Sequence, residues 1–156
     1  MQGSASRPVH PALREGLVFG VILGIITLTT NLLRNFVVSG ILGNILAVMF
    51  LIVFIALILL AGVRASQRTG RVRTGALAGL IVELISFLFG TIEILISIFG
   101  FDTPLHHLFS QATSQLVQQF ITASIISFVV LLLLGTLIGA IGGLIGRRRV
   151  HLPMQL

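Results

Sequence analysis

Four long apolar stretches, separated by short polar segments, make up most of this chain. Each is built from Leu, Ile, Val, Ala, Phe and Gly with a few isolated polar residues, and each reaches the roughly 20 residues that an α-helix needs to cross a bilayer. The stretches cover residues 16–38, 41–63, 75–101 and 120–146. The pattern therefore predicts an all-α fold, an integral membrane bundle of four helices.

Small and acidic residues recur along one side of the third stretch. The line consists of Gly75, Gly79, Glu83, Ser86, Gly90, Glu93 and Ser97. Its spacings of three and four residues keep these positions on one face of a helix packed in a left-handed bundle. Because an ionisable group facing hydrocarbon costs several kcal/mol, on the order of the insertion scales, we expect this face to point into the bundle.

The first stretch carries a similar line of polar and small residues. A shift that places Arg14 on Arg73 also places Gly16 on Gly75, and a weaker match relates the second stretch to the fourth. The line consists of Gly20, Gly24, Thr27, Asn31 and Arg34. Two interpretations stay open: two tandem, parallel two-helix hairpins, or chance similarity in a composition rich in Leu and Ile.

Arg34 is the one arginine that lies inside an apolar stretch. The same shift superposes Arg34 on Glu93, which puts the two residues at a similar depth along their helices. We favour a structural ion pair between Arg34 and Glu93, because buried charges are tolerated when they are paired. The alternative is that the arginine extends its side chain to the membrane surface and has no partner.

Composition supports a membrane protein and predicts its orientation. Of the 156 residues, 56% are hydrophobic and 9% charged, with a mean hydropathy of +1.13, whereas soluble domains carry roughly a quarter charged residues. Arginines flank the stretches mainly on one side, and positive charge marks the cytoplasmic side. We expect residues 1–156 to form a single domain in the cell membrane, with cytoplasmic tails at 1–15 and 147–156.

Glycines at intervals of four residues mark surfaces where helices can approach closely. Such ridges favour helix association in lipid, because van der Waals contact drives it there. The ridges consist of Gly16, Gly20 and Gly24, of Gly75 and Gly79, and of Gly135, Gly139 and Gly143. The ridge of the fourth stretch could pack inside the bundle or against a second copy of the chain, so a homo-oligomer stays open.

The net charge of +6 would suggest nucleic acid as a partner for a soluble chain. Here the arginines fit a role in topology and in contact with anionic lipid, so we expect no nucleic-acid partner. The partners that we expect are the lipid bilayer and other membrane proteins.

Glu83 is the sharpest candidate for chemistry, since no basic residue aligns with its depth in the bundle. A carboxyl removed from water favours its neutral form, which would suit a candidate proton or ion site. The alternative is a permanently neutral Glu83 that is hydrogen-bonded to a neighbour such as Ser86 or Thr27. Of the two interpretations we favour the structural one.

The segment between the third and fourth stretches contains the adjacent pair His106 and His107. Neighbouring side chains on a helix point about 100° apart, so the pair is a poor chelator and we expect no metal site. Around it, Pro104 and periodic apolar residues predict a short interfacial helix on the outer membrane surface, or a docking face for another protein.

The sequence contains no arrangement typical of an enzyme: no nucleophile with its base, no phosphate-binding glycine loop and no cysteine. We therefore expect neither catalysis nor a cofactor. The first functional hypothesis is a non-catalytic accessory subunit that interacts through helix packing. The alternative is a small proton- or cation-coupled transporter or channel that uses Glu83, and this alternative predicts a water-accessible cavity that reaches the residue.

Overall fold

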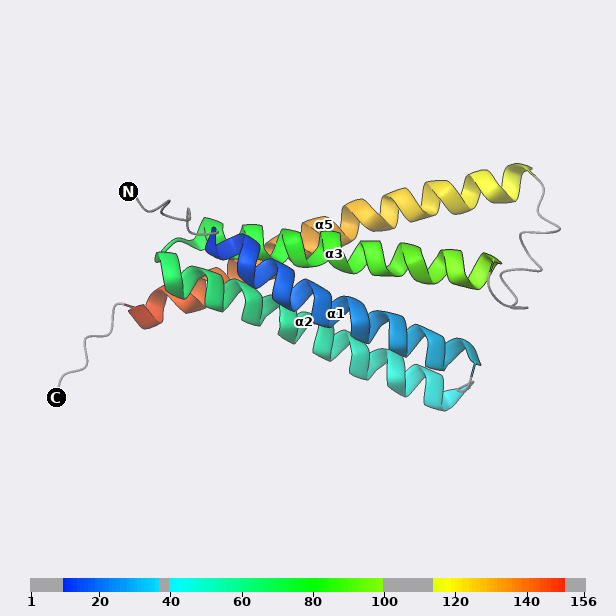
Figure 1. The fold of residues 1–156 in the computed structure, drawn as a ribbon, viewed down its shortest axis with the longest axis horizontal. Coiled ribbons are helices and arrows are strands. Elements are labelled where there is room, and N and C mark those ends of the chain that lie inside the picture. The colour runs from blue at the N-terminus through cyan, green and yellow to red at the C-terminus, as the bar shows by residue number, and fades with distance from the viewer. Residues whose placement is uncertain (1–9, 37–39, 100–113, 151–156) are drawn as a thin grey trace, which may run out of the picture.

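The computed structural model describes residues 10–36, 40–99 and 114–150. This part of the chain forms four long helices and no strand, so the all-α prediction is confirmed (Figure 1). The helices are α1 (Pro11–Phe36), α2 (Ile41–Thr69), α3 (Val72–Phe99) and α5 (Ser114–Val150). Each contains a stretch that is long and apolar enough to cross a membrane, and the four helices pack against one another.

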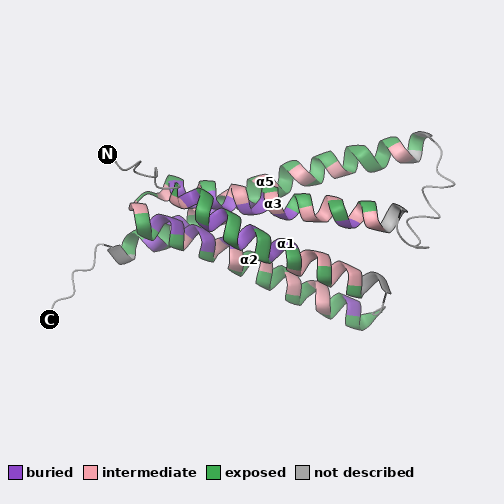
Figure 2. Cartoon of the chain, viewed as in Figure 1, coloured by how far each residue is buried: buried purple, intermediate pink, exposed green. Residues whose placement is uncertain are grey.

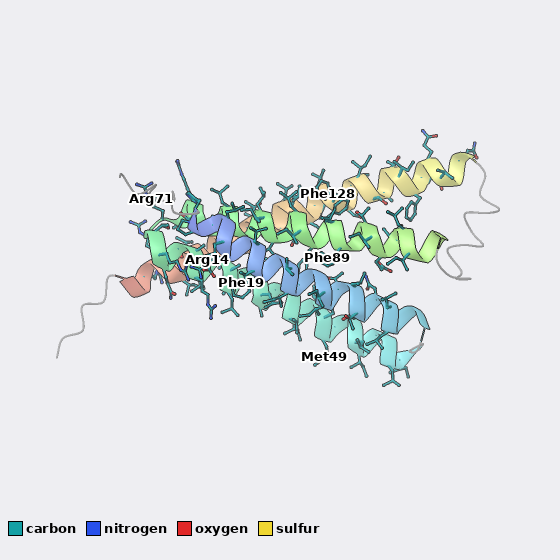
Figure 3. All side chains as sticks on the ribbon, in the orientation of Figure 1. Arg14, Phe19, Met49, Arg71, Phe89 and Phe128 are labelled. Atoms are coloured by element: carbon teal, nitrogen blue, oxygen red, sulfur yellow. The ribbon has the colours of Figure 1, made fainter. Side chains whose placement is uncertain are left out.

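Apart from Arg34, which lies near the opposite end of α1, the arginines of the described helices gather at one end of the bundle, which we call the arginine-rich end. The arginine-rich end comprises residues 11–16, 64–75 and 143–148. Arg14 and Arg71 mark this end in Figure 3. We call the opposite end, where α1 and α3 finish and α2 and α5 begin, the far end.

A two-residue connection joins α2 to α3, which is shorter than the polar segment between the predicted spans. The helix α2 continues through Arg64 to Thr69, and Gly70 ends it in the left-handed conformation with φ of 68°. The Gly70 N–H donates to the Ser66 carbonyl at 2.7 Å, and the Thr69 hydroxyl donates to the Thr74 hydroxyl at 2.9 Å. Glycine suits this position because it reaches positive φ without a steric penalty. The chain therefore reverses its direction within this two-residue turn, immediately after the last residue of α2.

The four helices converge at the arginine-rich end and diverge toward the far end (Figure 1). The helix α3 packs against α1, α2 and α5, and α2 packs against α1 and α5 as well. Burial follows this shape, because the buried residues gather toward the arginine-rich end in Figure 2. The buried apolar residues are Ala12, Phe19, Leu23, Ile58, Ala61, Ala65, Ala78 and Val82. Half of them are alanines, which let helix backbones come close together.

The glycines of α1 form a groove that receives large side chains of α3. A methyl group built on Gly16 would stand 2.7 Å from Ile81, and one built on Gly20 would stand 2.9 Å from Ile85. One turn further along, the ring of Phe89 occupies the space beside Gly24. The groove thus depends on the absence of side chains on this face of α1.

The glycines of α3 and α5 instead bring two backbones together. Gly75 and Gly79 of α3 face Gly139 and Gly143 of α5, with backbone atoms as the nearest neighbours on both sides, and Gly79 also faces the Gly135 carbonyl. Other glycines of α5, at 142 and 146, contact the backbone of α2. The ridge on α5 therefore lies inside the bundle, against α2 and α3.

Candidate functional site

Glu83 lies near the middle of the apolar part of α3 and is 3% exposed. Its side chain packs against α5, where the closest neighbour is Gly135: a methyl group built on that glycine would overlap the Cγ atom of Glu83. The close approach of α3 and α5 at Gly79 holds the two residues together. The lack of a side chain at Gly135 thus leaves space for the Glu83 side chain. The spacing of glycines in the sequence did not reveal this contact.

The Oε1 atom of Glu83 is buried and has no hydrogen-bond partner among the described residues. One hydroxyl that the sequence offered as a partner is engaged elsewhere, since Thr27 donates to the Leu23 carbonyl at 2.8 Å. Leaving a buried polar atom unpaired costs roughly 1–3 kcal/mol, and more when the group is charged. An atom kept under such a cost commonly has a role in binding or chemistry.

A cavity of about 270 Å³ borders Glu83. All four helices line it, and its walls are mostly apolar. The lining residues are Thr27, Phe50, Leu51, Phe54, Glu83, Ser86, Phe87, Gly90 and Leu131. This volume lies just below the roughly 300 Å³ at which ligand pockets begin, so it suits an ion with a few waters or a small organic group. Thr27, Glu83 and Ser86 supply the polar atoms of an otherwise apolar cavity, which is partly open because exposed side chains such as Leu51 and Phe87 line it.

Glu93, the second acid on α3, lies toward the far end and has a different setting. It is 8% exposed, and the Asn31 side-chain amide of α1 donates to its Oε2 atom at 3.2 Å. This contact links α1 to α3. The Arg34 side chain lies outside the described residues, so the ion pair between Arg34 and Glu93 stays a prediction.

Two further contacts at the arginine-rich end were not expected from the sequence. Arg68 of α2 lies 2.9 Å from the buried carboxylate of Glu15, and the Arg64 guanidinium stands 5.5 Å from the centre of the Phe19 ring. The sequence placed Glu15 in a polar tail, whereas α1 already begins at Pro11. Both contacts join α1 to α2.

His106, His107 and the predicted interfacial helix lie outside the described residues. Within the described ranges, no group of three potential metal ligands comes together. Comparisons with protein families, with curated proteins and with solved structures find no match to this chain.

Proposed function

We propose that the chain is a multi-pass protein of the cell membrane, with its arginine-rich end in the cytoplasm. Large apolar side chains on the outside of the bundle support this location: Ile41 is 80% exposed and Leu42 66%, and similar residues follow along all four helices. In water such a surface would drive aggregation, whereas lipid covers it at no cost. The excess of arginine at one end supports the orientation.

We further propose that the protein passes a proton or a small cation through the bundle, with Glu83 as the binding group. One observation carries this proposal: the Oε1 atom of Glu83, which has no hydrogen-bond partner among the described residues, borders a cavity to which all four described helices contribute. An unpaired carboxylate is costly in apolar surroundings, and a bound proton or cation removes that cost. The site therefore favours a bound proton or cation.

Proton flux into vesicles tests this function. The purified protein would be reconstituted in liposomes that contain a pH-sensitive dye, and a potassium gradient with valinomycin would impose a membrane potential. We expect wild-type vesicles to acidify at least tenfold faster than vesicles carrying Glu83→Gln, because the amide cannot bind and release a proton. Sodium or potassium flux, measured in vesicles without valinomycin, would identify a cation other than the proton.

Glu93→Gln is the matched control, since it removes the other described acid of α3, which does not line the cavity. This variant should retain at least half of the wild-type flux. Equal flux from wild type and Glu83→Gln, or wild-type flux no faster than that of empty vesicles, would contradict the transport proposal.

The accessory role is a second candidate, and the shape of α5 favours it. From Val117 to Leu134, the described side chains of α5 are exposed, except for those that form one narrow stripe along the helix. Within this stripe, Phe128 packs on Phe87 of α3 with ring centres 4.1 Å apart. The remaining circumference could hold the helix of a partner protein. Stable co-purification of one defined membrane protein in mild detergent, lost on substitution of exposed residues such as Ile125, would support this role.

A further inference from the structure

A second concave site lies at the arginine-rich end, where the turn between α2 and α3 approaches the end of α5. Its volume is about 470 Å³. The lining residues are Gly70, Arg71, Val72, Arg73 and Arg147. Three arginines from two distant parts of the chain therefore line one hollow.

The positive charge of this hollow is not balanced by acids. Of the described acidic residues only Glu15 lies at this end, and its carboxylate pairs with Arg68, which does not line the hollow. The first turn of α3, which starts at the hollow, contains no acidic residue. The positive end of the α3 dipole thus adds to the charge of the three arginines.

The hollow also lies at a defined position along the bundle axis, at the ends of the apolar sequence of α3 and α5. The apolar sequence of α3 starts at Gly75, two residues after Arg73, and that of α5 ends at Gly146, next to Arg147. In the membrane location proposed above, on which this inference rests, these positions mark the border between hydrocarbon and headgroups. Phosphate groups of lipids occupy this level.

We propose that Arg71, Arg73 and Arg147 bind the phosphoryl headgroup of an anionic phospholipid. The planar guanidinium group matches phosphate oxygens with paired hydrogen bonds, and several such groups together favour a headgroup with more than one negative charge. Inorganic phosphate offers the same chemistry, but it lacks the acyl chains that hold a lipid at this level. The lipid is therefore the occupant that the position of the hollow favours.

Lipid titration of the purified protein in detergent tests this site. The probes are dioleoyl phosphatidic acid, dioleoyl phosphatidylcholine and inorganic phosphate, and native mass spectrometry or the thermal unfolding midpoint reports binding. We expect phosphatidic acid to bind at least tenfold more tightly than phosphatidylcholine. The variants Arg73→Gln and Arg147→Gln should each weaken phosphatidic acid binding about tenfold, because each removes a charge-assisted contact.

Arg14→Gln and Arg148→Gln are the matched controls. Both residues are exposed arginines at the same end, and neither lines the hollow. Each control should bind phosphatidic acid within twofold of wild type. Equal weakening by controls and pocket variants would overturn the proposal in favour of diffuse charge attraction. Phosphate that competes at millimolar concentration, with no preference among lipids, would overturn it in favour of a soluble ligand.

This test is independent of transport through the bundle. Glu83→Gln should bind phosphatidic acid as the wild type does, because Glu83 lies far along α3 from the hollow. Wild-type protein that conducts protons but does not prefer phosphatidic acid would reject the lipid site alone. Wild-type protein that prefers phosphatidic acid but does not conduct protons would reject the transport function alone.

Discussion

Gly79 and Gly90 lie on the same line of α3, yet a side chain would meet different surroundings at each. A methyl group on Gly79 would overlap the Gly135 carbonyl of α5, a backbone atom that cannot turn away. At Gly90 a methyl group would find nothing within 4 Å. Alanine substitutions at the two positions therefore distinguish the role of Gly79 in close packing from the general effect of glycine on helix stability.

We predict that Gly79→Ala lowers the free energy of unfolding by about 1–3 kcal/mol, since the α3–α5 contact must open to admit the methyl group. Gly90→Ala should be neutral or stabilising by up to about 1 kcal/mol, because alanine favours a helix over glycine. Titration with SDS in mixed micelles measures both values. Similar losses in the two variants would contradict the packing role of Gly79.

At the scale of residues, the sequence predicted that the acidic residues of α3 are buried, but not which residues of other helices surround them. The spacing of three and four residues placed Glu83 and Glu93 on one line, and both are buried. Nothing in the sequence showed that Asn31 would reach Glu93 or that Gly135 would face Glu83, because these contacts depend on how neighbouring helices are rotated. The contribution of Phe50 and Phe54 to the cavity gave no signal either, since they belong to an uninterrupted apolar run.

At the scale of elements, the beginning of α1, at Glu15 and Phe19, contacts the last turns of α2. The ion pair between Glu15 and Arg68 has unequal members: the Glu15 side chain is 6% exposed and that of Arg68 is 46%. Arg64 strengthens the same contact through the face of Phe19, an interaction that contributes about 0.5–1 kcal/mol at exposed sites. The α1–α2 pair is therefore closed at the arginine-rich end by contacts that depend on charge.

We predict that Arg68→Gln destabilises the protein more than Glu15→Gln does. Removal of the arginine leaves a buried carboxylate without its partner, whereas removal of the carboxylate leaves an arginine that water can reach. The difference should be about 1 kcal/mol or more in unfolding experiments in mixed micelles. A larger loss for Glu15→Gln would show that the packing of the glutamate, and not its charge, dominates this contact.

The positions of the helices could be predicted from hydrophobicity, but their ends could not. The apolar stretches identified four helices, yet α2 and α5 continue into arginine-rich sequence and α1 starts ahead of its apolar run. Arginine, glutamine and serine are compatible with a helix, so the loss of hydrophobicity does not end one. Between α2 and α3 the helix ends at Gly70, whose backbone conformation stops it.

At the scale of the whole molecule, the structure gives the two ends of the bundle different characters. Buried residues gather at one end, where most of the described arginines also lie, and the other end is more exposed (Figure 2). The proposed orientation rests on this difference. It can be tested directly because the chain has no cysteine of its own.

We predict that single cysteines at the two ends react from opposite sides of the membrane. Gln115→Cys at the far end should be labelled in intact cells by an impermeant maleimide, since this polar side chain is exposed and precedes the membrane-spanning part of α5. Gln67→Cys, exposed at the arginine-rich end, should be labelled only after the cells are permeabilised. Mass-tagged maleimide and a gel shift report both reactions. Labelling of both positions in intact cells would contradict the proposed membrane location, and the reverse pattern would invert the orientation.

The divergence of the helices toward the far end has a consequence for the bilayer itself. In the proposed location, a bundle that widens from one end to the other displaces more area from the outer leaflet than from the inner one (Figure 1). A flat bilayer offers equal areas on both sides, whereas a curved one does not. Many copies gathered in one patch would therefore favour a membrane that bulges outward, with the far ends on its convex face.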